Sequence, residues 1–147
     1  MTNVEKARKE LQRGGALHRF VSNPQRLILQ TMLHGEEKYH FADVVLEAAG
    51  RVEKMPKPYE TEGLGQQATV WLHYFKGSTD AWITEKDAGD LMDDRQHQAF
   101  GKITNNGIKA DAEFVYISIE ELTSCGCELD LYWTPVTLAT LFGKESE

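Results

Sequence analysis

Three carboxylates near a predicted β-hairpin are the residues of this chain with the clearest potential for metal chemistry. Asp80, Glu85 and Asp87 lie close together in the sequence. Oxygen ligands of this kind hold hard divalent cations such as Mg²⁺ or Ca²⁺. One hypothesis is therefore a small metal-dependent enzyme that uses these three residues. Carboxylates beside a turn are more often solvated, so we do not expect a bound metal.

Two histidines are weak candidates for a general base. His73 alternates with apolar residues in a predicted strand, a pattern typical of a packed side chain, and His97 follows an acidic run. The chain has no phosphate-binding loop, no nucleophile elbow, no His-Glu-x-x-His motif and no dinucleotide fingerprint. We therefore expect a non-enzymatic protein that uses no cofactor.

The two cysteines, Cys125 and Cys127, are separated by one residue. A disulfide between positions so close would be strained, and a tetrahedral metal site would need two more soft ligands. The N-terminus lacks the apolar core of a signal peptide, and no apolar stretch approaches the ~18 residues that span a membrane. We expect two free thiols in a soluble, cytoplasmic protein without a membrane partner.

Charge divides the chain into a basic head and an acidic body. Residues 1–40 carry seven bases and four acids, a net charge of +3, whereas residues 41–147 carry nine bases and nineteen acids, a net charge of −10. An acidic surface repels nucleic acid and attracts basic proteins. Alternatively, it only keeps the protein soluble. The head of one copy could also dock on the body of another, which would give a homodimer.

Carboxylates on a sheet and on short capped helices can reproduce the negative field of a phosphate backbone. The lysines and arginines of a nucleic-acid-binding protein pair readily with such groups. Exposed tryptophan and tyrosine side chains add anchors, since they dominate interface hot spots. The residues expected to bind a partner are Asp111, Glu120, Glu121, Glu128 and Asp130, a second patch of Asp90, Asp93 and Asp94, and the aromatic anchors Tyr59, Trp82 and Tyr132.

Two short helices are predicted at the N-terminus. The first spans residues 2–13 and is capped by Thr2. The second spans residues 23–35, and its apolar stripe is formed by Leu27, Ile28 and Met32, with Leu33 as a further candidate. Two helices joined by a turn also suggest a helix-turn-helix, but the second helix offers few polar side chains that could read base edges.

The middle of the chain is predicted to be largely extended. Two interpretations compete for residues 36–54: Phe41, Val44, Val45 and Ala48 suit a helix, whereas the clustered β-branched side chains favour an extended segment, which we expect. Residues 55–67 form a loop with prolines and glycines. Residues 68–76 are apolar on both faces, which predicts the central strand of a sheet. A tight turn leads to a paired strand over residues 81–85, and residues 87–95 suit a short exposed helix.

The last third alternates strands with short capped helices. Strands are predicted over residues 98–104, 113–119 and 128–133. Ser118 is the expected cap of one short helix, and Thr134 is the expected cap of the last. Removing either cap should cost ~1 kcal/mol.

These elements predict a single α+β domain over residues 1–147. An antiparallel sheet of about five strands, centred on residues 68–76, would be packed by the N-terminal helices and by the short C-terminal ones. Residues 1–35 form the basic helical head, and residues 36–147 form the acidic, sheet-containing body.

An ordered set of motifs resembles an uncharacterised family of small proteins encoded on plasmids, integrative elements and prophages. The motifs are LHYFKG at 72–77, DAWITEKD at 80–87, QAFG at 98–101, YISIEEL at 116–122 and ELDLYWTP at 128–135, and the resemblance covers residues 55–138. It implies no catalytic residue, because the family has no established activity. Its genetic setting implies a role in transfer, in maintenance of the element, or in disarming host restriction and CRISPR systems.

The leading hypothesis is a non-enzymatic acidic binding protein of a mobile genetic element. Its partner would be a basic nucleic-acid-binding protein or complex of the host, inhibited by occlusion of its nucleic-acid-binding surface. The first alternative is a plasmid transfer or transcription regulator that contacts DNA through residues 1–35, for which the net charge of −7 is unfavourable. The second is the metal-dependent enzyme.

Overall fold

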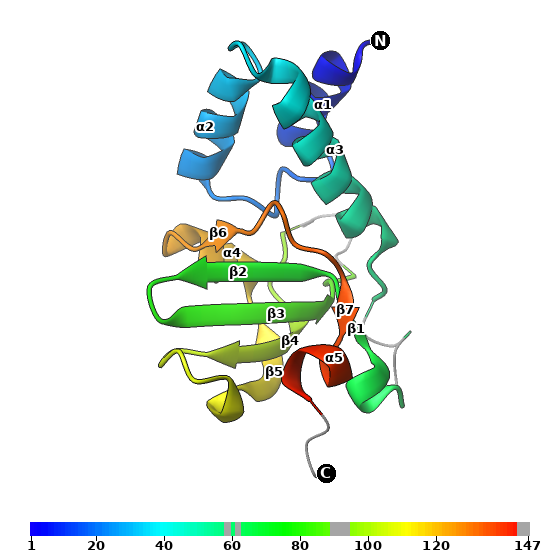
Figure 1. Ribbon diagram of the computed structural model, residues 1–147, viewed down its shortest axis with the longest axis vertical. Coiled ribbons are helices and arrows are strands. Elements are labelled where there is room, and N and C mark those ends of the chain that lie inside the picture. The colour runs from blue at the N-terminus through cyan, green and yellow to red at the C-terminus, as the bar shows by residue number, and fades with distance from the viewer. Residues whose placement is uncertain (58–59, 61–62, 89–94, 144–147) are drawn as a thin grey trace.

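The computed structural model describes residues 1–57, 60, 63–88 and 95–143. Three helices gather at one end of the molecule, and the sheet lies beyond them (Figure 1). They are α1 (Asn3–Leu11), α2 (Asn23–Met32) and α3 (Lys38–Lys54). No helix in this part of the chain is both long enough and apolar enough to cross a bilayer.

The sheet has five antiparallel strands in the order β5-β4-β3-β2-β6, which confirms the predicted α+β fold. In chain order the strands are β2 (Leu72–Lys76), β3 (Thr79–Glu85), β4 (Ala99–Thr104), β5 (Glu113–Ile117) and β6 (Glu128–Leu129). A separate pair joins β1 (Thr69–Val70) to β7 (Val136–Thr137). The shorter helical elements are η2 (Gly65–Gln67), η3 (Lys109–Asp111), α4 (Ile119–Ser124) and α5 (Leu138–Phe142).

The predicted extended segment over residues 36–54 is wrong, because α3 occupies it. Its buried side chains recur at helical spacing, and they are Ala42, Val44, Val45, Ala48, Ala49 and Val52. This stripe packs mainly against α1, and its small alanine side chains allow the two helices to approach each other closely. Burial of one helical face therefore overrides the weak strand preference of the β-branched residues.

The predicted apolar stripe of α2 is also wrong. Leu27, Ile28 and Met32 are exposed, whereas Gln25 and Leu29 face the interior. The predicted first helix is confirmed, and its cap is a complete capping box between Thr2 and Glu5.

Two predicted strands are shorter than expected. The segment 68–76 breaks at Trp71 into β1 and β2, and β3 rather than this segment is central. The strand over residues 128–133 ends at Leu129, because the chain turns through residues 131–132. The predicted helix over residues 87–95 falls largely outside the described residues.

The last helix begins later than predicted. The hydroxyl of Thr137, and not that of Thr134, accepts from Thr140 N at 3.1 Å, because β7 first pairs with β1. The cap at Ser118 is confirmed, since its hydroxyl accepts from Glu121 N at 3.0 Å.

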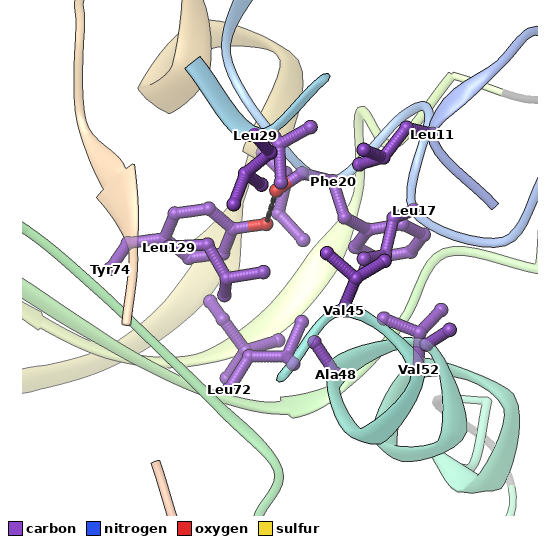
Figure 2. Packing of buried hydrophobic residues seen from close by; sticks show 14 of the residues in the cluster. Leu11, Leu17, Phe20, Leu29, Val45, Ala48, Val52, Leu72, Tyr74 and Leu129 are labelled. Carbon is purple, nitrogen blue, oxygen red and sulfur yellow. Dashed lines mark hydrogen bonds between the residues drawn. The ribbon is translucent and has the colours of Figure 1, made fainter. Parts of the chain in front are cut away.

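The main core lies between the helical head and the inner face of the sheet (Figure 2). Tyr74 is fully buried there, and its hydroxyl donates to the backbone carbonyl of Phe20. Burial raises the pKa of Tyr74 well above its ordinary value, so the phenol stays protonated as a donor. A smaller cluster on the opposite, outer face packs Val70, Trp82 and Leu138 together.

A buried glutamine joins the helical head to the last strand of the sheet. Gln25 is 8% exposed; its Nε2 donates to Leu129 O at 2.8 Å, and its Oε1 accepts from Leu129 N at 2.9 Å. The side-chain amide therefore pairs with both backbone groups of Leu129, as a neighbouring strand would. This explains why a polar side chain of α2 faces the interior while Leu27 and Ile28 do not.

We predict that Gln25→Ala lowers the free energy of unfolding by about 2–4 kcal/mol, because it leaves a buried donor and acceptor unpaired. Urea denaturation followed by circular dichroism measures the change. Gln30→Ala, on the same helix, is the matched control and should change the stability by less than about 0.5 kcal/mol. Equal effects of the two substitutions would contradict the proposed role of Gln25.

Candidate partner-binding surface

The outer face of the sheet is defined by cross-strand neighbours. His73 lies opposite Trp82, and Phe75 lies opposite Glu128, whereas the intervening Tyr74 faces the core. Because side chains alternate along a strand, His73, Phe75, Trp82 and Glu128 share the outer face. Helix α5 covers part of this face, where Phe142 meets Trp82 edge-on at 5.1 Å between ring centroids.

His73 lies between two carboxylates on this face. Its Nε2 is 2.8 Å from Asp80 Oδ1, and its Nδ1 is 3.2 Å from Asp130 Oδ2. A neutral imidazole carries one N–H and donates to one of these carboxylates, whereas an imidazolium donates to both.

Aromatic rings fix the orientation of His73. The ring stacks on Trp82 at 5.7 Å with an interplanar angle of 16°, and on Phe75 at 5.8 Å with an angle of 26°. Trp133 tilts against it at 5.2 Å and donates from Nε1 to Val70 O at 3.0 Å. Stacking holds the imidazole where both carboxylates reach it, which in turn fixes Asp80 and Asp130.

The chain after β6 is held by further contacts. Asp130 Oδ1 accepts from Tyr132 N at 3.1 Å, and Arg51 Nη2 donates to Leu131 O at 2.9 Å. Tyr132 is 66% exposed, and its hydroxyl lies 3.1 Å from His40 Nε2. The turn therefore places the ring of Tyr132 against His40 of α3, two residues along the chain from Asp130.

We call this surface the acidic edge. It is formed by Phe75, Asp80, Glu128, Asp130 and Tyr132, which come from β2, β3, β6 and the turn that follows. Three of them are residues that the sequence predicted to bind a partner, namely Glu128, Asp130 and Tyr132. Carboxylates with exposed aromatic rings suit contact with lysine or arginine side chains.

The other predicted carboxylates lie elsewhere. Glu120 lines a polar hollow of about 200 Å³ together with Arg19 and Arg26 of the head. Burial lowers the pKa of Arg26, and the nearby charge of Arg19 lowers it further. Glu121 borders a different groove beside β5, and Asp111 accepts from Asn106 Nδ2 at 2.8 Å in η3. The single acidic face expected from the sequence is thus divided.

The aromatic anchors and the second patch have different outcomes. Trp82 is wrong as an exposed anchor, because it is 4% exposed beneath α5. Tyr59 and the patch of Asp90, Asp93 and Asp94 lie outside the described residues.

The hypothetical metal site at Asp80, Glu85 and Asp87 is not formed. Asp80 and Glu85 lie at opposite ends of β3, about 16 Å apart at the usual rise along a strand. Glu85 is buried, and Asp87 Oδ2 accepts from Gln98 N at 2.9 Å. Among the residues that the structure describes, no three histidine, cysteine or acidic side chains form a metal-binding group.

Sequence reasoning did not identify His73, Phe75 and Asp80 as members of one surface. Alternation in residues 68–76 already places His73 and Phe75 on one face, and a tight hairpin brings Trp82 opposite His73. No local sequence pattern indicates the contact between His73 and Asp130, because the two residues are 57 positions apart.

Comparisons with known proteins give no relative for this chain: no protein-family model, no curated protein and no solved structure matches it.

We predict that His73→Phe lowers the free energy of unfolding by about 1–2 kcal/mol, because it retains a stacked ring but removes the two nitrogens that contact Asp80 and Asp130. Chemical denaturation measures the effect. The comparison is made in a variant that already carries Asp80→Asn and Asp130→Asn. In that variant, His73→Phe should lower the free energy of unfolding by less than about half as much as in the natural chain. An equal cost in both backgrounds would show that His73 contributes packing alone.

Proposed function

We propose that this protein is a non-enzymatic acidic binding protein whose partner is a basic, nucleic-acid-binding protein. The observation that carries the proposal is the acidic edge, where Asp80, Glu128 and Asp130 share one face with exposed aromatic side chains. The carboxylates of Asp80 and Asp130 are held in place by His73 before a partner arrives, which lowers the entropic cost of binding.

The acidic edge keeps acceptor capacity for a partner. His73 engages Oδ1 of Asp80, and within the described ranges no residue hydrogen-bonds to the Glu128 carboxylate, which is exposed. An arginine placed there could contact a carboxylate and stack on Tyr132 or Phe75. These groups resemble a nucleic-acid strand in charge and in the presence of flat rings, which supports competition for a surface that normally binds nucleic acid.

Contact with DNA through residues 1–35 is less well supported. Gln25 is used inside the molecule, and Arg26 Nη2 donates to His18 O at 3.2 Å. The side chains that α2 exposes are mainly Leu27, Ile28 and Met32, which lack the groups that read base edges.

The resemblance of residues 55–138 to proteins of mobile elements directs the search for the partner. Host CRISPR and restriction complexes handle nucleic acid through basic channels, and mobile elements benefit from blocking them. We therefore propose inhibition by occlusion of such a channel.

We predict that the protein displaces labelled target DNA from one of these purified complexes at low salt, as measured by fluorescence anisotropy. Glu128→Lys combined with Tyr132→Ala should weaken the displacement about tenfold or more, because it reverses a charge and removes an anchor. Displacement should also weaken as the ionic strength rises.

Glu113→Lys is the charge-matched control, because Glu113 is exposed on β5, at the opposite edge of the sheet from the acidic edge. It should leave the displacement within about twofold of that of the natural chain. Equal losses in both variants would indicate a response to net charge alone. Absence of association with every complex tested at low salt would exclude the proposed function.

A further inference from the structure

The two edges of the five-stranded sheet differ. At the β6 edge, Gln25 occupies both backbone groups of Leu129, and Arg51 binds the carbonyl of Leu131. At the other edge, β5 pairs with β4 on one side, and its other side has no hydrogen-bonded neighbour within the described part of the chain. An open edge of this kind accepts a further strand.

The side chains of β5 suit such an addition. On the outer face, Phe114 is 41% exposed and Tyr116 is 66% exposed, and both rings pack against Phe100 at 5.6 and 5.3 Å between centroids. The strand holds no proline or lysine, the residues that commonly protect an edge from pairing. Its backbone and this aromatic row are therefore both available for contact.

A groove runs beneath the same edge on the inner face. It has a volume of about 610 Å³ and lies between the sheet and α4. The sheet contributes Ile103, Val115 and Ile117 to its lining. Helix α4 contributes Leu122, and the segment after α4 contributes Cys127. The volume is in the range of pockets that hold several side chains or a small ligand. Burial raises the pKa of the Cys127 thiol, so this side chain stays a neutral thiol.

Charge at the rim favours a basic occupant. The carboxylates of Glu121, which borders the groove, and Glu113, which is exposed on β5, outnumber the single charge of Lys76, which lines the groove and donates from Nζ to Cys125 O at 2.6 Å. We propose that the β5 edge and the groove beneath it bind an extended segment of a partner protein in which apolar residues alternate with lysine or arginine. Its backbone pairs with β5, its apolar side chains pack against Phe114 and Tyr116 on the outer face, and its basic side chains extend over the groove toward Glu113 and Glu121.

A second copy of this chain fits the edge less well. Pairing of β5 with itself would bring two molecules of net charge −7 together. This surface is also separate from the acidic edge, since the two lie on opposite sides of five strands, about 19 Å apart. The inference therefore does not depend on the proposed function.

The test uses the full chain and a synthetic peptide, acetyl-Arg-Val-Arg-Val-Arg-Val-Arg-amide. We expect saturable binding, with NMR shifts in the amides of β5 and α4 and with new protection of β5 amides from exchange. The same peptide with N-methylated valines keeps the charge but cannot form the backbone pairing. It should bind at least about tenfold more weakly.

Variants locate the site and separate it from the acidic edge. Glu121→Lys and Val115→Lys should each weaken peptide binding about tenfold, whereas Glu128→Lys, on the opposite edge, should change it less than twofold. Glu121→Lys alters an exposed side chain, so it remains informative if Val115→Lys fails to fold.

Equal binding of the parent and N-methylated peptides, or shifts confined to the acidic edge, would overturn the proposal. Sedimentation analysis of the free chain supplies a further outcome. A dimer in which the β5 amides are protected would assign the edge to a second copy instead and would also overturn it.

Discussion

The structure depends on the pairing between the amide of Gln25 and the backbone of Leu129. Strand β6 has two residues, too few to hold its place by the pairing with β2 alone. The amide of Gln25 forms hydrogen bonds on the side of β6 that β2 does not use. These bonds also join α2 to the sheet, although the two residues are 104 positions apart in the sequence. The turn that carries Asp130 and Tyr132 follows Leu129 directly. The contact of Leu129 with Gln25 of the helical head therefore helps to fix the position of the acidic edge.

His73 performs a comparable task on the outer face. Its ring lies between Asp80 and Asp130, with Nε2 2.8 Å from the first carboxylate and Nδ1 3.2 Å from the second. The surrounding rings limit access of water to the histidine, while both carboxylates stay about 30% accessible. The same arrangement therefore stabilises the sheet and leaves negative charge at the surface.

Local patterns were sufficient to predict much of the fold, and contacts between distant segments explain the failures. The hairpin between β2 and β3 and the caps at Thr2 and Ser118 follow from short-range chemistry. The α2 stripe could not be predicted, because Gln25 faces inward only when Leu129 is present as its partner. Residues 36–54 form a helix because α1 covers their alanine-rich face. Of the candidate site, Glu128, Asp130 and Tyr132 were recognisable as outward-facing residues, but their grouping with Asp80 required the sheet order.

The unequal edges of the sheet also limit how far the molecule can assemble. A sheet that is open on both sides can add copies of itself without end, which is the route to fibres. Here Gln25 terminates one side, so any strand that joins at β5 meets a molecule whose far side cannot continue the ladder. Growth by this route stops after a single addition. Because Gln25 occupies the backbone of β6, the chain can leave β5 open for strand pairing without forming a continuous polymer.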